Sequence, residues 1–311
     1  MATATAATSQ PKRNWRAPRE EQPFLFFLMN TPAALILLGL VLYPIVYSLY
    51  LSLHNYNLRQ PNRFRFVGLD NYANILGSEQ FWTAAQVTVL FSIGSIALTL
   101  TLGTLLALLL NENFPGRSIL RAVMLIPWAI PPVVNGLIWQ WILEGRYGLA
   151  NGVLVALGIF DTPHPWLSDY ATALPVLIVA QVWNHVPFVA IVVLAALQTV
   201  PEELHEAARI DGANVFQRFR HITFPWLSHA LLLVLITQTM VALRTFDIIY
   251  VLTGGGPGKS TTVLAWLTYV TTFNFLDFGR GSAYAYILAL TTLALSIVYI
   301  RVLWKRGELA R

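Results

Sequence analysis

Six long apolar segments, separated by short polar stretches, constrain this chain more than any other feature. They run at 32–53, 84–110, 119–143, 171–197, 229–251 and 283–303. A hydrocarbon core about 30 Å thick needs about 20 mostly apolar residues per helix. Only 11% of the residues are charged, whereas a soluble domain has about 25%. The sequence therefore predicts an all-α membrane protein with six transmembrane helices. The helices of a soluble bundle would each carry a polar stripe.

The positions of the Lys and Arg residues predict the orientation of these helices. With the N-terminus inside, the cytosolic side holds Lys12, Arg13, Arg16, Arg19, Arg117, Arg121, Arg209, Arg218, Arg220, Arg301, Lys305, Arg306 and Arg311. The outer side holds Arg59, Arg63, Arg65, Arg146, Lys259 and Arg280. Because basic residues accumulate inside, we expect both termini to be cytosolic.

The basic N-terminus lacks the apolar core of a secretory signal. We expect residues 1–23 to form a largely disordered cytosolic tail, and residues 24–311 to form the six-span domain.

Composition excludes several kinds of site. The chain has no cysteine, which rules out disulfides and Cys-ligated metals. No metal site is expected at His185, because no second ligand lies at a suitable spacing. The sequence at 258–261, G-K-S-T, resembles part of a phosphate loop, but the glycine that this motif needs at 253 is Thr253. The excess of Lys and Arg over Asp and Glu is accounted for by the predicted orientation of the membrane helices. No nucleic-acid partner is therefore expected.

The longest polar stretch on the predicted cytosolic side is the loop at 199–228. Pro201 suits a first helical turn, with Glu202 and Glu203 beside the positive end of the helix. Gly212 can end that helix, and a second amphipathic stretch begins near Val215. The pattern predicts a short helix pair outside the membrane whose apolar face is covered by lipid headgroups or by a partner protein.

This loop resembles the EAA motif of binding-protein-dependent ABC importer permeases, E-A-A-x3-G-x9-I-x-L-P. The matching positions are Glu206, Ala207, Ala208, Gly212, Ile222 and Pro225, and Phe224 stands where leucine is usual. The resemblance implies a coupling helix that sits in a cleft of a cytosolic ATPase. It implies that the ATPase-coupling residues are Glu206, Ala207, Ala208, Asp211 and Gly212.

Four further segments are similar to the sugar-permease branch of the maltose-transporter type. They are W-N-H-V-P-F at 183–188, L-T-G-G-G-P at 252–257, G-L-D-N-Y at 68–72 and G-L-A-N at 148–151. The resemblance runs from about residue 24 to 306. It implies the ABC type I importer permease architecture, in a bacterial or archaeal cytoplasmic membrane.

The same resemblance implies the partners. They are a second homologous permease, two ATPase subunits, an extracytoplasmic solute-binding protein and membrane lipid. The chain itself would not be an enzyme and would hold no cofactor, because ATP and Mg would bind to the ATPase subunits. It would form half of the transmembrane pathway for a sugar or oligosaccharide.

The positions that contact solute in the maltose-type relative can also be transferred to this sequence. The resemblance implies contacts at Asn184, His185, Phe188, Gln238, Val241, Ala242 and Thr245. Asn, Gln and Thr can hydrogen-bond to hydroxyls, and Phe can stack on a sugar face. Val241 and Ala242 are apolar, so the solute specificity of the maltose-type relative is not carried over.

Arg244 and Asp247 are ionisable residues within the fifth segment. Their spacing of three predicts one helix face and a possible ion pair. A structural salt bridge and a solute-facing polar site both fit, because intramembrane charges face a partner or a cavity.

Three alternatives to a sugar permease stay open at this point. An exposed Arg244 would favour a permease for glycerol-3-phosphate or another anionic small solute. A secondary transporter would need buried carboxylate relays, and Asp247 is the one candidate. A membrane enzyme would need a catalytic cluster that the scattered histidines do not form.

Overall fold

The computed structural model describes residues 23–308, with side chains for residues 28–301. The chain divides into two compact units at Tyr50 and Leu51. The first unit contains α1 (Pro23–Ile36), the π-helix η1 (Leu37–Leu42) and most of α2 (Tyr43–Ser52). Together these make an uncharged candidate span at Leu28–Ser52. Most of the predicted tail, residues 1–22, lies outside the described residues.

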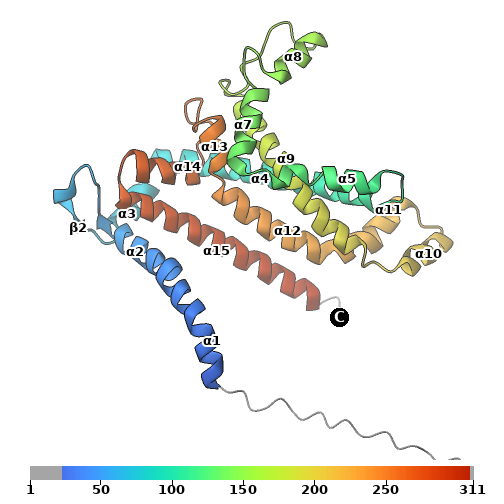
Figure 1. Ribbon diagram of the computed structural model, residues 1–311, viewed down its shortest axis with the longest axis horizontal. Helices are drawn as coiled ribbons and strands as arrows, with labels where there is room; N and C mark the ends of the chain where they lie inside the picture. The colour runs from blue at the N-terminus through green and yellow to red at the C-terminus, as the bar shows by residue number, and fades with distance from the viewer. Residues whose placement is uncertain (1–22, 309–311) are drawn as a thin grey trace, which may run out of the picture. The chain divides into compact units, whose positions relative to one another are not determined.

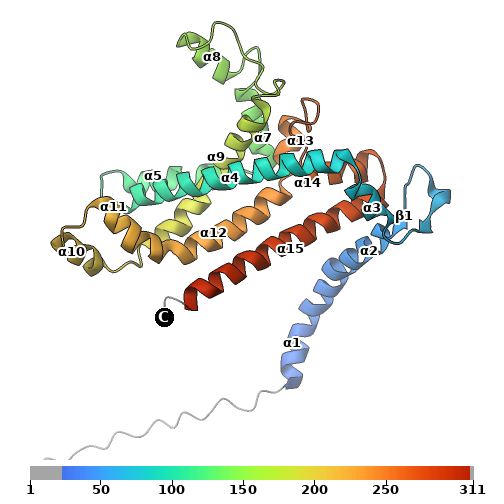
Figure 2. The same cartoon turned by 180° about the vertical axis from the view of Figure 1, so that it is seen from behind.

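The second unit is built on four long helices that run side by side in Figures 1 and 2. They are α4 (Glu79–Asn111), α9 (Ala173–Leu197), α12 (Phe224–Arg244) and α15 (Phe278–Glu308). Each lies within a segment that is long and apolar enough to cross a membrane. A core cluster that includes Ala107, Leu110, Val189 and Leu227 joins α4, α9 and α12.

Shorter elements complete this unit at the end of α4 that starts with Glu79. The hairpin of β1 (His54–Asn55) and β2 (Arg65–Phe66) is antiparallel, with a 3-10 turn, η2 (Pro61–Arg63), between its strands. It is followed by α3 (Asp70–Leu76). Before α15 come α14 (Leu264–Tyr269) and the π-helix η4 (Val270–Asn274). Asn71 joins α3 to the start of the hairpin, because its amide donates to the backbone oxygens of Ser52 and His54.

The third predicted span is a broken helix. It consists of α5 (Arg117–Val123) and α6 (Ile126–Ala129), followed by α7 (Pro132–Ile142), with a bend of 98° at the break. The bend falls at Pro131 and Pro132, where proline cannot donate the helical hydrogen bond. Counting this bent pair as one span gives the six spans that the sequence predicts.

The fifth predicted span is also interrupted, and here the expectation of one continuous helix was wrong. α12 ends at Arg244, Thr245 is extended, and α13 (Asp247–Leu252) begins afresh. The turn at 253–258 follows α13, as expected, and Thr261 closes it with a hydroxyl bond to the Gly256 oxygen (2.6 Å). The helix α13, rather than a strand, leads directly into this turn, so the turn lacks the context of a phosphate loop.

The contact between α4 and α9 generates a testable prediction. An ideal Cβ at Gly103 would lie 2.5 Å from Cγ1 of Val189. Gly103→Ala should therefore destabilise the protein by about 1–3 kcal/mol through overpacking. Thermal unfolding of the purified protein in detergent would show this as a lower midpoint.

The matched control is Gly152→Ala, because nothing lies within 4 Å of a Cβ built at Gly152 in a helix. This substitution should leave the midpoint unchanged or raise it slightly, since alanine is the better helix former. Equal midpoints for the two variants would contradict the close packing.

Candidate functional site

The candidate coupling loop lies beyond the ends of α9 and α12, beside α5 (Figure 2). Its first helix is α10 (Glu202–Ile210), which has Pro201 at the N-cap and Glu202 and Glu203 in the first turn. Carboxylates near the N-terminus and Arg209 in the last turn complement the helix dipole. The helix predicted from the sequence is therefore present, with the expected start.

Gly212 ends α10 with a left-handed backbone conformation. Its φ is +79°, its N–H donates to the Arg209 oxygen (3.1 Å), and the Ala213 N–H donates to the Ala208 oxygen (2.9 Å). These bonds are those of a Schellman motif, in which glycine tolerates the left-handed backbone. Nothing lies within 4 Å of a Cβ built at Gly212. Within this chain the glycine is needed for its backbone angle rather than for space.

The second helix, α11 (Val215–Arg218), begins three residues after Gly212, with a capping box at Asn214. The Gln217 N–H donates to the Asn214 side chain (2.9 Å), and the Asn214 N–H donates to the Gln217 side chain (2.8 Å). This box satisfies two helix-end donors at once. The turn between α10 and α11 is therefore fixed at both of its ends.

The base of the loop is closed by a side-chain hydrogen bond. The Trp226 indole N–H donates to the Thr199 hydroxyl oxygen (3.0 Å), across 27 residues of sequence. The π-helix η3 (Phe219–Thr223) connects α11 to α12. Sequence reasoning did not identify Thr199, Trp226 or the capping pair. The N-x-x-Q pattern at Asn214 was the one local signal available.

The predicted coupling residues form an exposed surface. Glu206, Ala207, Asp211 and Gly212 are exposed and Ala208 is half-buried. Glu206 forms no salt bridge with a described residue. Apolar side chains stand beside them, with Ile210 86% and Phe216 70% exposed. A hollow of about 360 Å³ runs between the two helices and is lined by residues that include Ala208, Asp211, Gly212 and Ile222. The surface has the open form that a docking site needs.

The predicted pathway residues fall into two groups. Asn184, Gln238, Ala242 and Thr245 are buried within the chain, whereas His185, Phe188, Val241 and Asp247 are half-buried and Arg244 is exposed. The Phe188 ring lies 5.9 Å from that of Trp128, between ring centroids. Only the second group has surface that a solute could contact in this conformation.

Asn184 has a specific structural role. Its amide donates to the backbone oxygens of Pro127 (2.5 Å) and Ile130 (3.3 Å) at the break before α7. The Pro127 oxygen would normally accept from residue 131, but Pro131 has no N–H. The Ile130 N–H also donates to the Pro127 oxygen (3.3 Å). Asn184 therefore adds a second donor at this break, where neighbouring helices help to satisfy the backbone.

The ion pair considered between Arg244 and Asp247 does not form. The spacing argument assumed one helix, but the chain breaks between the two residues. Among the described residues, neither takes part in a salt bridge. The break places a charged residue on each side of a non-helical turn, next to Thr245, whose hydroxyl accepts from the Gln181 amide (3.4 Å).

These features can be compared with known proteins. Residues 99–304 match the family described as the inner membrane component of binding-protein-dependent transport systems. The chain belongs to this family. The matched range covers the coupling loop, the broken fifth span, the whole of α9 and most of α15.

The chain is also similar to proteins of known role. It is 41% identical to the trehalose/maltose transport system permease protein MalF of Thermococcus litoralis, over 89% of this chain and 93% of that protein. It is 33% identical to the trehalose transport system permease protein SugA of Mycobacterium tuberculosis, over 96% and 93% respectively.

A solved structure shares the fold. This is a bacterial alginate ABC transporter in complex with an alginate pentasaccharide-bound periplasmic protein, with a TM-score of 0.77 and 22% identity. The match covers 89% of this chain and 92% of that chain. The chain is thus a multi-pass membrane permease with the ABC type I importer architecture expected from the sequence.

The geometry of Gly212 generates a second prediction. Because its φ is positive and its surroundings are open, Gly212→Val should loosen the turn at a cost of about 1–2 kcal/mol, whereas Gly212→Asn should cost less. Amide hydrogen exchange over residues 202–218 would measure this. Faster exchange in both variants to the same extent would contradict a purely conformational role.

Proposed function

We propose that this chain is one permease subunit of an ATP-driven ABC importer and forms half of the transmembrane pathway for a sugar or oligosaccharide. The observation that carries the proposal is the exposed coupling surface on α10, where Glu206, Ala207, Ala208, Asp211 and Gly212 stand at the positions of the family motif. The named relatives, which transport trehalose and maltose, support a saccharide as solute.

The proposed assembly follows from this role. A second homologous permease completes the pathway, and two ATPase subunits bind ATP and Mg and hydrolyse the nucleotide. An extracytoplasmic solute-binding protein delivers the solute. The assembly lies in a bacterial or archaeal cytoplasmic membrane, with both termini of this chain in the cytosol. The excess of Lys and Arg on that side supports the orientation.

In the proposed mechanism α10 transmits motion between subunits. Closure of the ATPase dimer would push the rigid α10–α11 turn, and this push would reach α9 and α12, which continue directly from the loop. The hydrogen bond between Trp226 and Thr199 holds the two ends of the loop together, so α9 and α12 would move as one body. The pathway would thereby switch between inward- and outward-facing states.

The solute would meet the exposed group of pathway residues. Arg244, Asp247 and His185 offer hydrogen bonds to hydroxyls, and Phe188 offers an aromatic face. Val241 would lie beside them. The buried residues Asn184, Gln238, Ala242 and Thr245 would support this surface from behind.

A second candidate is a permease for glycerol-3-phosphate or another anionic solute. Arg244 favours it, because this side chain is exposed and forms no salt bridge with a described carboxylate. The relatives named above favour the saccharide, and the solute that the wild type takes up separates the two.

The coupling role predicts the effect of two substitutions. Glu206→Gln and Gly212→Asp should abolish solute uptake by the reconstituted complex and leave ATP hydrolysis running uncoupled, because both alter the surface that meets the ATPase. Uptake of labelled disaccharide and phosphate release would be measured together. Glu202→Gln is the matched control on the same helix and should transport normally. Normal uptake by Gly212→Asp would refute docking at this loop.

A saccharide solute predicts how Arg244→Gln changes the KM for uptake. Loss of one charged hydrogen bond to a saccharide costs about 1.5–3 kcal/mol, so the KM for trehalose or maltose uptake should rise at least tenfold with little change in Vmax. Arg280→Gln serves as the control, because Arg280 pairs with Asp277 in the outer part of the chain (3.8 Å). Uptake of glycerol-3-phosphate rather than disaccharide by the wild type would favour the anionic solute.

A further inference from the structure

The hairpin formed by β1 and β2 has two chemically different faces. His54 pairs with Phe66 in the ladder, and residues directly opposite each other in an antiparallel pair share a face. Their rings accordingly lie 5.3 Å apart, between centroids. The next pair, Asn55 and Arg65, lies on the other face, because successive side chains of a strand alternate. One face of the hairpin is therefore aromatic, and the other carries a cation.

The aromatic face continues into the segment that leads to α15. Neighbouring ring centroids are 4.9–6.2 Å apart in the series Phe66, His54, Phe64, Tyr56, Phe278 and Phe273, here named the aromatic series. The rings at its two ends are open, since Phe66 is 68% and Phe273 57% exposed. Contiguous exposed apolar surface of this kind marks a site of contact with a protein or a membrane.

Hydrogen bonds hold the hairpin against the start of α15. The Gly279 N–H donates to the Tyr56 oxygen (3.1 Å). The Arg59 guanidinium donates to the Asn274 oxygen (2.6 Å). These bonds give the hairpin a fixed place on the long helices, and they use one of its arginines within the chain.

The hairpin lies at the level where membrane spans end. One residue, Leu53, separates it from the span at Leu28–Ser52, and it is bonded to the start of the span at Phe278–Arg301. Figures 1 and 2 show it at the opposite end of the long helices from α10. The hairpin therefore lies at the membrane surface opposite the coupling loop.

Two arginines of the hairpin remain available to an external anion. Arg63 and Arg65 are exposed, and the side chain of neither is paired with any described residue. Residues 53–69 contain three arginines and no Asp or Glu. This concentration runs against the positive-inside rule, which predicts few basic residues on the side opposite the cytosol. The local excess of positive charge is thus suited to a negatively charged ligand from outside the chain.

We infer that Arg63 and Arg65 bind the phosphate headgroup of an anionic phospholipid, in the leaflet opposite the coupling loop, while the aromatic series lies against the adjoining part of its acyl chains. The guanidinium group has planar donors that match phosphate oxygens. Aromatic side chains gather at headgroup level, and interfacial surfaces combine them with basic residues. The hairpin has both kinds of side chain at that depth.

The depth and the chemistry of the surface favour lipid over the other possible occupants. A free phosphate ion would use the two arginines and leave the exposed rings of Phe66 and Phe273 uncovered. A soluble protein would have to reach rings that lie beside the ends of two spans, where lipid headgroups already surround the chain. A phospholipid satisfies the cations and covers the rings with one molecule.

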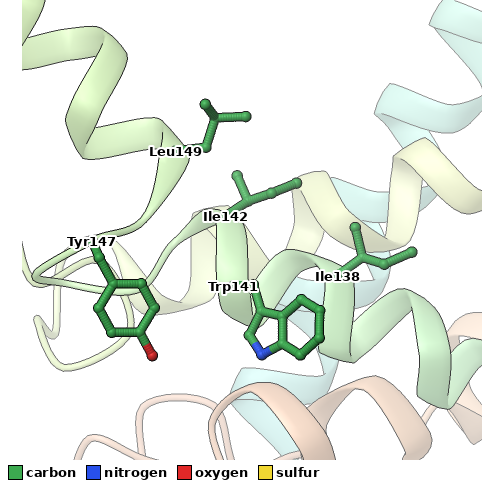
Figure 3. Close-up of a pocket in the computed structure, with 5 residues that line it drawn as sticks. All are labelled: Ile138, Trp141, Ile142, Tyr147 and Leu149. Carbon is green, nitrogen blue, oxygen red and sulfur yellow. The ribbon is translucent and has the colours of Figure 1, made fainter.

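A second aromatic surface on the same side of the membrane lacks this combination. Figure 3 shows a hollow of about 570 Å³ lined by Ile138, Trp141, Ile142, Tyr147 and Leu149, none of which is charged. The neighbouring arginine, Arg146, stands beside an acid, because the Glu144 carboxylate accepts from the Arg146 backbone N–H (2.6 Å). Exposed rings are therefore present here without an uncompensated cation, and Arg146 supplies the control.

Lipid retention by the chain, purified together with the subunits that accompany it, tests this inference. Native mass spectrometry would count bound phosphatidylglycerol and phosphatidylcholine of equal chain length. Arg63→Gln and Arg65→Gln should each weaken phosphatidylglycerol binding about fivefold, equivalent to about 1 kcal/mol per arginine, and leave phosphatidylcholine binding unchanged. Arg146→Gln removes an exposed arginine on the same side and should bind both lipids as the wild type does. Wild-type retention by both hairpin variants would overturn the inference.

Photo-crosslinking identifies the occupant in intact membranes. A benzophenone side chain at position 66 replaces one exposed ring by another and should give adducts with phospholipid, identified by mass spectrometry. Adducts with the solute-binding protein or the second permease in place of lipid would contradict the inference. Displacement of phosphatidylglycerol by excess inorganic phosphate would do the same, since the arginines would then serve a free anion. Neither measurement depends on the solute, so their failure is distinct from a failure of the proposed function.

Discussion

The close packing of α4 against α9 is the contact on which the rest of the second unit depends. Both helices have small residues where they meet, and Val189 occupies the space that a side chain at Gly103 would need. In a membrane there is little hydrophobic force between helices, so close approach through small residues is what joins them. Because α9 is held in this way, the segment at 143–172 before it and the coupling loop after it both acquire a fixed base.

The second constraint is that every backbone polar group within a membrane needs a partner. Prolines break the third span, and the Asn184 side chain donates to the Pro127 and Ile130 oxygens beside the break, in addition to the backbone bond from Ile130 to Pro127. This gives the polar Asn184 a structural role within an apolar helix, because it holds the shape of the bend beside it.

Much of the fold could be predicted from the sequence, because the length of each apolar segment indicates a span independently of tertiary context. The α10 helix and its end at Gly212 were predictable for the same reason: proline, acidic residues and glycine act locally. The break between Arg244 and Asp247 was not, since this stretch contains neither proline nor glycine. The burial of Asn184, Gln238 and Thr245 depends on which neighbouring helix packs against the face that carries each residue. The periodicity of the sequence does not say which helix that is.

The arrangement of α9 links the coupling loop to the far side of the membrane. The helix has 25 residues and spans about 37 Å at 1.5 Å per residue, with the segment 143–172 before its start and the coupling loop after its end. A partner shifts a conformational equilibrium only through a difference in its affinity for the two states. If α9 tilts as a rigid body between inward- and outward-facing states, both of its ends move together. A protein bound on the coupling loop would then favour one tilt, and by thermodynamic linkage it and a solute bound beside α9 would alter the affinity of each other by the same factor. Coupling across the membrane therefore requires only one helix that is held rigidly by α4.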